Sequence, residues 1–261
     1  MNLQGDANVT VGLNVGAMYD VNERITLGAS FRTKMMMKVN AGSAYVRYAN
    51  AITENLLGTS LGLINEANFK AEMPCPWVFG IGIAYKPVDR LTLAFDARLT
   101  GWNTYKSLDI EFLSEQLTPY NQNITKNYKN SWCYSLGAQY ALTDRFDIRA
   151  GLMVDTSPVN KEYYNPETPG TTKIEPTVGF SFRPYKNLSV DFGFMYIEGL
   201  RIKNASCTYD DVLGATVINM LTQTGYPQQA IDQLGFKARQ TFTADYKLHA
   251  FCPSIGVSYK F

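Results

Sequence analysis

The chain has 261 residues, 46% of them hydrophobic, and a formal net charge of +1 at neutral pH. That charge argues against nucleic-acid binding, which needs a strongly basic surface. No run of about 18 apolar residues occurs, so no transmembrane helix is predicted. The four cysteines lie far apart and lack a C-x-x-C spacing, so neither a zinc site nor a redox motif is indicated, while a disulfide stays open.

Apolar and polar residues alternate with period two through most of the chain. This pattern predicts β-strands whose two faces meet different surroundings. Residues Phe79, Ile81 and Ile83, for example, share one face, while Gly80 and Gly82 share the other. The predicted strands lie at about 8–20, 25–40, 76–86, 91–112, 130–142, 146–156, 174–184, 188–205 and 241–261.

Short and long connections are predicted to alternate between these strands. Each short connection follows an aromatic residue and contains Asp, Asn or Pro, which favour turns. The four short ones are Tyr19–Ile25, Tyr85–Leu91, Tyr140–Phe146 and Phe182–Leu188. The long ones lie at about 41–75, 114–130, 157–173 and 206–240. Short periplasmic turns and long extracellular loops are typical of bacterial outer-membrane barrels.

Aromatic residues at the strand ends distinguish a membrane barrel from a soluble β-sandwich, which also shows alternation. They form two girdles of the kind that flanks the apolar band of a barrel in lipid. The girdle residues are Tyr19, Tyr85, Tyr140 and Phe182 at the short turns, with Trp77 and Trp132 at the opposite end. We therefore predict one all-β domain over residues 1–261: an antiparallel transmembrane β-barrel in the bacterial outer membrane, with outer-membrane lipid as a partner.

The polar face of the strands carries charged residues at mid-strand. Because this face would line the enclosed lumen, opposite charges such as Asp96 and Arg98, or Asp147 and Arg149, are expected to pair across neighbouring strands. Such a network is a structural feature of the lumen, and we favour it over a role in ion selectivity.

The C-terminal strand ends on an aromatic residue. Its one-face residues are Ile255, Val257, Tyr259 and Phe261. This ending resembles the terminal signal that the bacterial barrel-assembly machinery recognises, so that machinery is an expected partner during biogenesis.

Nine strands do not close a barrel of the usual kind. Single-chain bacterial barrels use even numbers of antiparallel strands, whereas the first and ninth strands here would run in the same direction. The N-terminal residues also lack the basic and apolar regions of a secretory signal. We therefore expect the sequence to be the C-terminal portion of a longer chain or the product of a truncated gene.

Three segments together resemble, in order, hairpins of FadL/TodX-type outer-membrane transporters. They are VGLNVGAMYDVNERITLGASFRTKM, WVFGIGIAYKPVDRLTLAFDARLTGWNTYKSLDIEF and YSLGAQYALTDRFDIRAGLMVDTSPV. Thr100-Gly101-Trp102 falls at the Gly-Trp element of that family. The resemblance implies a barrel of about 14 strands, plugged by an N-terminal hatch, that carries long-chain fatty acids or other hydrophobic compounds inward. The hatch, the first strands and the Asn-Pro-Ala element of the family have no counterpart here.

Two apolar loops and part of the lumen face supply candidate contacts for a hydrophobic small-molecule ligand. The loops at 52–73 and 212–236 either pack as an extracellular cap or form an apolar capture groove, and Asp211–Thr224 has the spacing of a short helix. Lumen methionines suit apolar contact, and lumen arginines suit a carboxylate, although core filling and ion pairing would use the same residues. The candidates are Leu56, Leu57, Leu61, Leu63, Phe69, Val212, Leu213, Val217, Leu221, Met36, Met153, Met195, Arg32 and Arg98.

Enzymatic activity is not expected. The single histidine, His249, lies near Asp245, but the sequence has no G-x-S-x-G motif and no second histidine, and no cofactor or metal is implied. The main alternative to a transporter is a structural or adhesive barrel without transport activity. A lumen filled by side chains would favour that alternative, and an open apolar lumen would favour a carrier.

Overall fold

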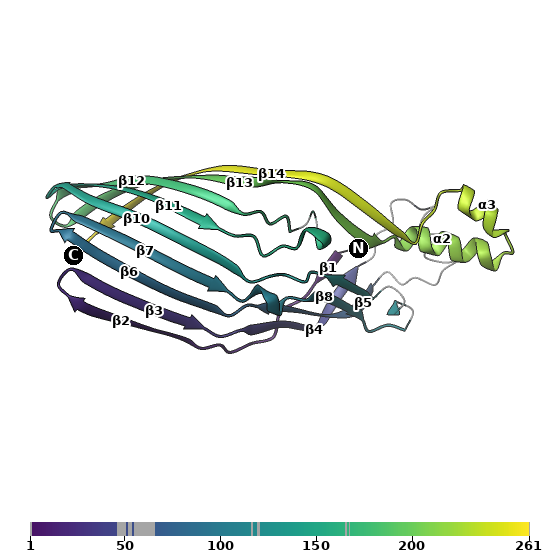
Figure 1. The fold of residues 1–261 in the computed structure, drawn as a ribbon. Helices are drawn as coiled ribbons and strands as arrows, with labels where there is room; N and C mark the ends of the chain where they lie inside the picture. Colours follow the sequence, from purple (N-terminus) through teal and green to yellow (C-terminus); the bar gives the residue numbers. More distant parts are fainter. Residues whose placement is uncertain are drawn as a thin grey trace.

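The computed structural model describes residues 2–45, 51, 54, 66–115, 117–118, 121–164, 166 and 168–260. Its main feature is a curved antiparallel sheet of nine strands, in the order β14-β13-β12-β11-β10-β7-β6-β3-β2 (Figure 1). The short turns lie at one end, together with the C-terminus, and we call the opposite end the upper end. No helix of the described part is long and apolar enough to cross a membrane.

The nine strands of this sheet correspond to the nine predicted strands. They are β2 (Asn14–Asn22), β3 (Ile25–Arg32), β6 (Val78–Val88), β7 (Leu91–Thr100), β10 (Ser131–Thr143), β11 (Phe146–Asp155), β12 (Lys173–Tyr185), β13 (Leu188–Asp210) and β14 (Arg239–Tyr259). The first prediction was too long, because β2 begins at Asn14. Before it, the Leu13 N–H donates to the Thr33 side-chain oxygen at 2.9 Å. A side chain there replaces the backbone carbonyl that would continue the ladder.

A second sheet sits on the upper end, and the sequence did not predict it. It contains β1 (Asn2–Gln4), β4 (Met35–Tyr45), β5 (Glu66–Cys75), β8 (Ser107–Phe112) and β9 (Gln122–Thr125), in the order β1-β4-β5-β8-β9. The predicted loops at 41–75 and 114–130 therefore contain strands, and the predicted strands 25–40 and 91–112 are each divided in two. The breaks fall at residues 33–34 and 101–106. A further junction between the two sheets falls at Pro76, between β5 and β6, where the missing N–H group of proline removes a ladder hydrogen bond.

Two helices stand at the tip of the β13–β14 hairpin (Figure 1). The predicted helix at Asp211–Thr224 is confirmed as α2 (Val212–Gln223), and the Asp211 carboxylate caps it by accepting the Gly214 N–H at 2.9 Å. The following α3 (Gln228–Gln233) was not predicted. It is too short and too polar to show a helical period.

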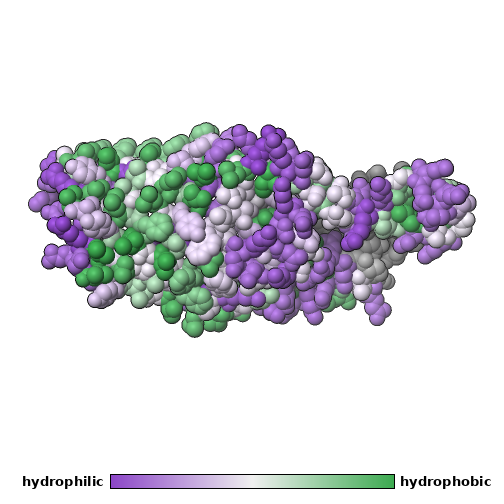
Figure 2. Space-filling model, in the orientation of Figure 1, coloured by the Kyte–Doolittle hydropathy of each residue, from purple (hydrophilic) through white to green (hydrophobic). Residues whose placement is uncertain are grey.

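The outer face of the main sheet is apolar over its lower half. Side chains on alternate positions of β6, β10 and β12 are exposed, including Ile81, Leu136 and Val178. Figure 2 shows a broad hydrophobic band over the short-turn half of the barrel, which gives way to a more hydrophilic surface toward the upper end. A band of this extent needs an apolar environment, and lipid provides it.

The inner face carries ion pairs between strands, with partners that differ from those predicted. Asp147 is held by both terminal nitrogens of Arg183, at 2.7 and 2.8 Å. Arg149 lies 3.5 Å from Asp191, two strands away, and its immediate neighbour on β12 is Gly179, which leaves room for this reach. In the part of the chain that the structure describes, neither Asp96 nor Arg98 forms an ion pair.

Candidate functional site

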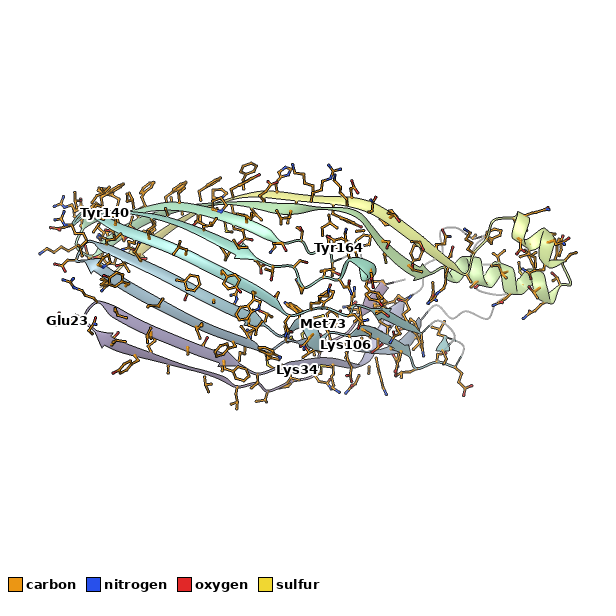
Figure 3. The ribbon with its side chains drawn as sticks, viewed as in Figure 1. Glu23, Lys34, Met73, Lys106, Tyr140 and Tyr164 are labelled. Carbon is orange, nitrogen blue, oxygen red and sulfur yellow. The ribbon has the colours of Figure 1, made fainter. Side chains whose placement is uncertain are left out.

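A cavity of about 860 Å³ lies inside the upper end of the main sheet, where it meets the second sheet. Met73 and Lys34, labelled in Figure 3, mark this junction, while Tyr140 and Glu23 mark the short-turn end. Six strands of the main sheet (β2, β3, β6, β7, β10 and β11) and the end of β5 form its wall, and the breaks between strands form its roof. The lining residues are Asn14, Ser30, Arg32, Met73, Pro74, Cys75, Pro76, Val78, Arg98, Thr100, Trp102, Tyr105, Tyr128, Ser131, Asp155, Pro158, Val159, Thr168, Pro169 and Gly170.

Two cations face this cavity without an ion-pair partner among the described residues. Arg32 ends β3 and Arg98 lies on β7, with β6 between them. Two strand spacings and a two-residue offset separate their Cα atoms by about 12 Å. The one acidic lining residue, Asp155, is bound to Lys173 at 2.9 Å. The wall therefore carries excess positive charge on arginine guanidinium groups, which bind a carboxylate through two parallel hydrogen bonds.

Three aromatic rings form the roof beside these cations. Tyr105 and Tyr128 meet edge to face with ring centres 5.2 Å apart, and Trp102 meets Tyr128 at 5.9 Å. The Tyr128 hydroxyl lies 3.1 Å from the Thr168 hydroxyl, which ties the roof to the loop before β12. Edge-to-face packing of this kind holds the rings in place, so the roof offers a fixed apolar surface.

Gly101 allows this roof to form. Its N–H donates to the Trp77 carbonyl at 2.8 Å, and a Cβ atom at this position would overlap the Trp77 indole ring. The glycine therefore lets the chain leave β7 directly across that ring and turn into the short helix η2 (Trp102–Thr104). The Gly-Trp pair seen in the sequence is thus a close-packing requirement.

A family model for outer membrane protein transport proteins (OMPP1/FadL/TodX) matches residues 1–261. The chain belongs to this family. Several relatives are named outer membrane proteins, and together with the family they confirm the predicted outer-membrane localisation.

The chain covers about half the length of the relatives that it matches. It is 27% identical over 201 residues to the 47 kDa outer membrane protein of Pasteurella multocida, which covers 76% of this chain and 45% of that protein. It is 24% identical over 195 residues to the long-chain fatty acid transport protein of Escherichia coli, with coverages of 74% and 42%. The crystal structure of a Pseudomonas aeruginosa FadL homologue matches with a TM-score of 0.68 and 18% identity, over 95% of this chain and 52% of that one.

The other predicted ligand contacts lie away from this cavity. Phe69 is 5% exposed in the core of the second sheet, where it packs with Ala44 and Phe112. Its place is therefore in a packed core and not in an open groove. Met36, Met153 and Met195 are half-buried on β4, β11 and β13, and none of the three lines the cavity.

Of the candidates in the two apolar loops other than Phe69, the structure describes the side chains of Val217 and Leu221. Val217 and Leu221 are half-buried on α2, beside a second, more polar cavity of about 1110 Å³ that other α2 residues line. Outside the described residues or side chains lie Leu56, Leu57, Leu61, Leu63, Val212 and Leu213.

The roof and rim of the cavity were not selected from the sequence. Trp102, Tyr105 and Tyr128 come from breaks between strands, where alternation gives no information about facing. The sequence feature that could have identified them is the cluster of Gly, Trp, Tyr and Pro at these breaks, because such clusters mark turns and close approaches of the backbone.

The remaining reactive side chains form no second site in the described part of the chain. All four cysteines are free thiols, and among the residues that the structure places no group of three or more His, Cys, Asp or Glu side chains is arranged to hold a metal ion. His249 lies opposite Glu198 on the β13–β14 ladder. Tyr164 is buried against Tyr246, with ring centres 4.5 Å apart, and burial raises the pKa of the Tyr164 hydroxyl.

Proposed function

We propose that the protein carries hydrophobic small molecules, with long-chain fatty acids as the first candidates, across the outer membrane. The observation that supports this most directly is the cavity, which combines a fixed aromatic roof with two arginines that form no ion pair among the described residues. Its volume of about 860 Å³ lies within the range of small-molecule sites in proteins. The names of the Escherichia coli and TodX relatives point to substrates of the same chemical class.

The lining gives the ligand an expected orientation. A carboxylate head would lie between Arg32 and Arg98, since guanidinium groups bind carboxylates through two parallel hydrogen bonds. The hydrocarbon tail would lie along Pro74, Val78 and Trp102. No step of this binding needs a cofactor or a reacting group.

A structural or adhesive barrel would be expected to fill this space. Ion pairs do cross the lower lumen, between β11, β12 and β13, and they account for Asp147, Arg149 and Arg183 there. At the upper end, by contrast, the two arginines face open volume. Both arginines are exposed to this volume and form no ion pair among the described residues, so their guanidinium groups stay available to a ligand; the cavity therefore favours a carrier.

The test is binding of a fluorescent fatty acid to the full chain in detergent. Each charge-assisted hydrogen bond contributes about 1.5–3 kcal/mol, so Arg32→Gln and Arg98→Gln should each weaken binding by roughly 10- to 100-fold. Arg90→Gln at a short turn is the matched control and should change nothing. Fatty alcohols should bind all four proteins alike.

Saturable binding that ignores both cavity arginines would show that the head group lies elsewhere. If no lipid-like probe bound saturably while circular dichroism showed that the strands were folded, the result would favour the structural barrel.

We also propose that the barrel-assembly machinery recognises the end of β14. Ile255, Val257 and Tyr259 are all exposed on one face of this edge strand, as the sequence pattern required. Phe261 lies outside the described residues. An exposed, aromatic-ended edge strand is a surface on which another β-structure can pair.

A further inference from the structure

The outer face of the β13–β14 hairpin changes character abruptly along its length. Below the change, Phe251 packs against Tyr196, with ring centres 5.2 Å apart, and Ile255, Val257 and Tyr259 continue the apolar face toward the C-terminus. Above it, odd-numbered β14 residues stay on the same face, because the two irregularities of this ladder place their extra residues on β13 and leave β14 regular. These residues are His249, Lys247 and Asp245.

Across the ladder, β13 adds three more charged side chains to this surface. Glu198 lies opposite His249, and Arg201 and Lys203 flank Ile202, which is paired with inward-facing Tyr246. We call the six residues Glu198, Arg201, Lys203, Asp245, Lys247 and His249 the upper collar. Figure 2 shows a hydrophilic surface along this edge, directly beyond the hydrophobic band.

The two acidic members of the collar already have partners. Asp245 accepts hydrogen bonds from Arg201 at 2.7 Å and from the Asn204 backbone N–H at 3.0 Å. These two donors hold the pKa of Asp245 below its usual range. The Glu198 carboxylate accepts the hydroxyl of Tyr196.

Positive charges outnumber negative ones in the collar. Lys203 and Lys247 form no ion pair in the described part of the chain, and both are exposed. With Arg201, Lys203 and Lys247 positive and Glu198 and Asp245 negative, the collar carries a net charge of +1 without counting His249.

The height of the collar above the apolar band decides what these lysines meet. From Phe251 to Tyr259 the strand runs about 27 Å, which a tilt near 40° reduces to a height of about 20 Å. Barrel bands are about 25 Å tall, so the band ends about 5 Å above Phe251. Lys247 lies about 10 Å above Phe251, or about 5 Å beyond the hydrocarbon. The headgroup layer on each side of a bilayer is about 5–8 Å thick, so Lys247 lies inside it. Lys203 is level with Asp245 across the ladder, about 5 Å higher than Lys247, and its long flexible side chain brings the ammonium group down to this layer.

We propose that Lys203 and Lys247 bind the phosphate groups of phosphorylated lipid headgroups in the outer leaflet. Cationic side chains at headgroup depth attract anionic lipid, and an ammonium group is a strong point partner for phosphate. The bound lipid would fix the height of the barrel in the membrane. The proposal rests on the membrane placement of the barrel and is independent of transport.

The test measures binding of lipid A, a bisphosphorylated glycolipid, to the full chain in dodecylmaltoside micelles by native mass spectrometry. A lysine near a charged bilayer contributes about 1 kcal/mol, which corresponds to about a fivefold change in affinity. The double variant Lys203→Gln/Lys247→Gln should therefore bind lipid A roughly 5- to 30-fold more weakly. The matched control, Lys86→Gln/Lys186→Gln, removes two exposed lysines at the short turns and should bind like the wild type.

Three results would overturn the proposal. The first is that the double variant and the wild type bind lipid A with equal affinity, while circular dichroism shows that both are folded. The second is equal binding of lipid A from which the phosphates have been removed. The third is displacement of the lipid by inorganic phosphate at low concentration, which would make the site one for a free anion. Fatty acid binding is measured separately, so failure of either proposal is distinguishable from failure of the other.

Discussion

At the scale of single residues, glycines show how little of a residue's role can be read from its type. Gly101 lies where any Cβ atom would strike Trp77, whereas a Cβ atom at Gly137 on β10 would meet no atom within 4 Å. Both glycines occur within or beside alternating strands, and the alternation alone gives no reason to assign them different roles. Only the packing of Trp77 distinguishes them.

This difference predicts opposite outcomes for one chemical change. Gly101→Ala should lower the free energy of unfolding by about 1–3 kcal/mol, because overpacking displaces the indole ring. It should also weaken fatty acid binding, because Trp102 moves with the turn. Gly137→Ala is the control and should leave both unchanged. Thermal unfolding in detergent measures the first effect, and equal melting temperatures for the two variants would contradict the close-packing role.

At the scale of elements, the alternation of each strand was enough to predict which face meets lipid. Leu136 is 58% exposed on the outer face of β10, and its neighbour Ser135 points inward, opposite Asp96 and Met153. The sequence assigned both positions correctly because the side-chain period of a strand is fixed at two. The bounds of the elements were less certain, since caps, prolines and side-chain hydrogen bonds end them.

These adjacent residues provide a test of the membrane orientation. Leu136→Arg should lower stability by about 2–4 kcal/mol, the cost of a lipid-facing arginine near the middle of a barrel band. Ser135→Arg should be tolerated, because the new cation faces the lumen beside Asp96, which has no ion-pair partner among the described residues. Urea unfolding from lipid vesicles measures both. If Leu136→Arg kept the stability of the wild type and Ser135→Arg lowered it, the two faces would be the reverse of those described.

At the scale of the whole molecule, the structure has two separate cavities, and each is lined by a different cysteine. Cys75 lines the cavity with the arginines, and Cys207 lines the more polar cavity beneath α2. Each thiol therefore reports on one cavity. Neither cysteine carried any meaning in the sequence, where both were isolated residues in long connections.

A ligand in the proposed site should protect one of these thiols. In variants that keep a single cysteine, a saturating fatty acid should slow maleimide labelling of Cys75 several-fold and leave labelling of Cys207 unchanged. Protection of Cys207 alone would move the binding site to the cavity beneath α2. The rate of labelling with and without ligand is the measurement.

The sequence by itself determined the fold class, the nine strands, their outward faces and helix α2, because each depends on a local period or cap. It also marked Arg32 and Arg98 as inward-facing cations. Only the tertiary structure decided that these two arginines share one cavity, that Phe69 belongs to a packed core, and that Asp147 binds Arg183. Such contacts depend on strand register and on the path of the chain between strands, and neither is encoded in the alternation of a single strand.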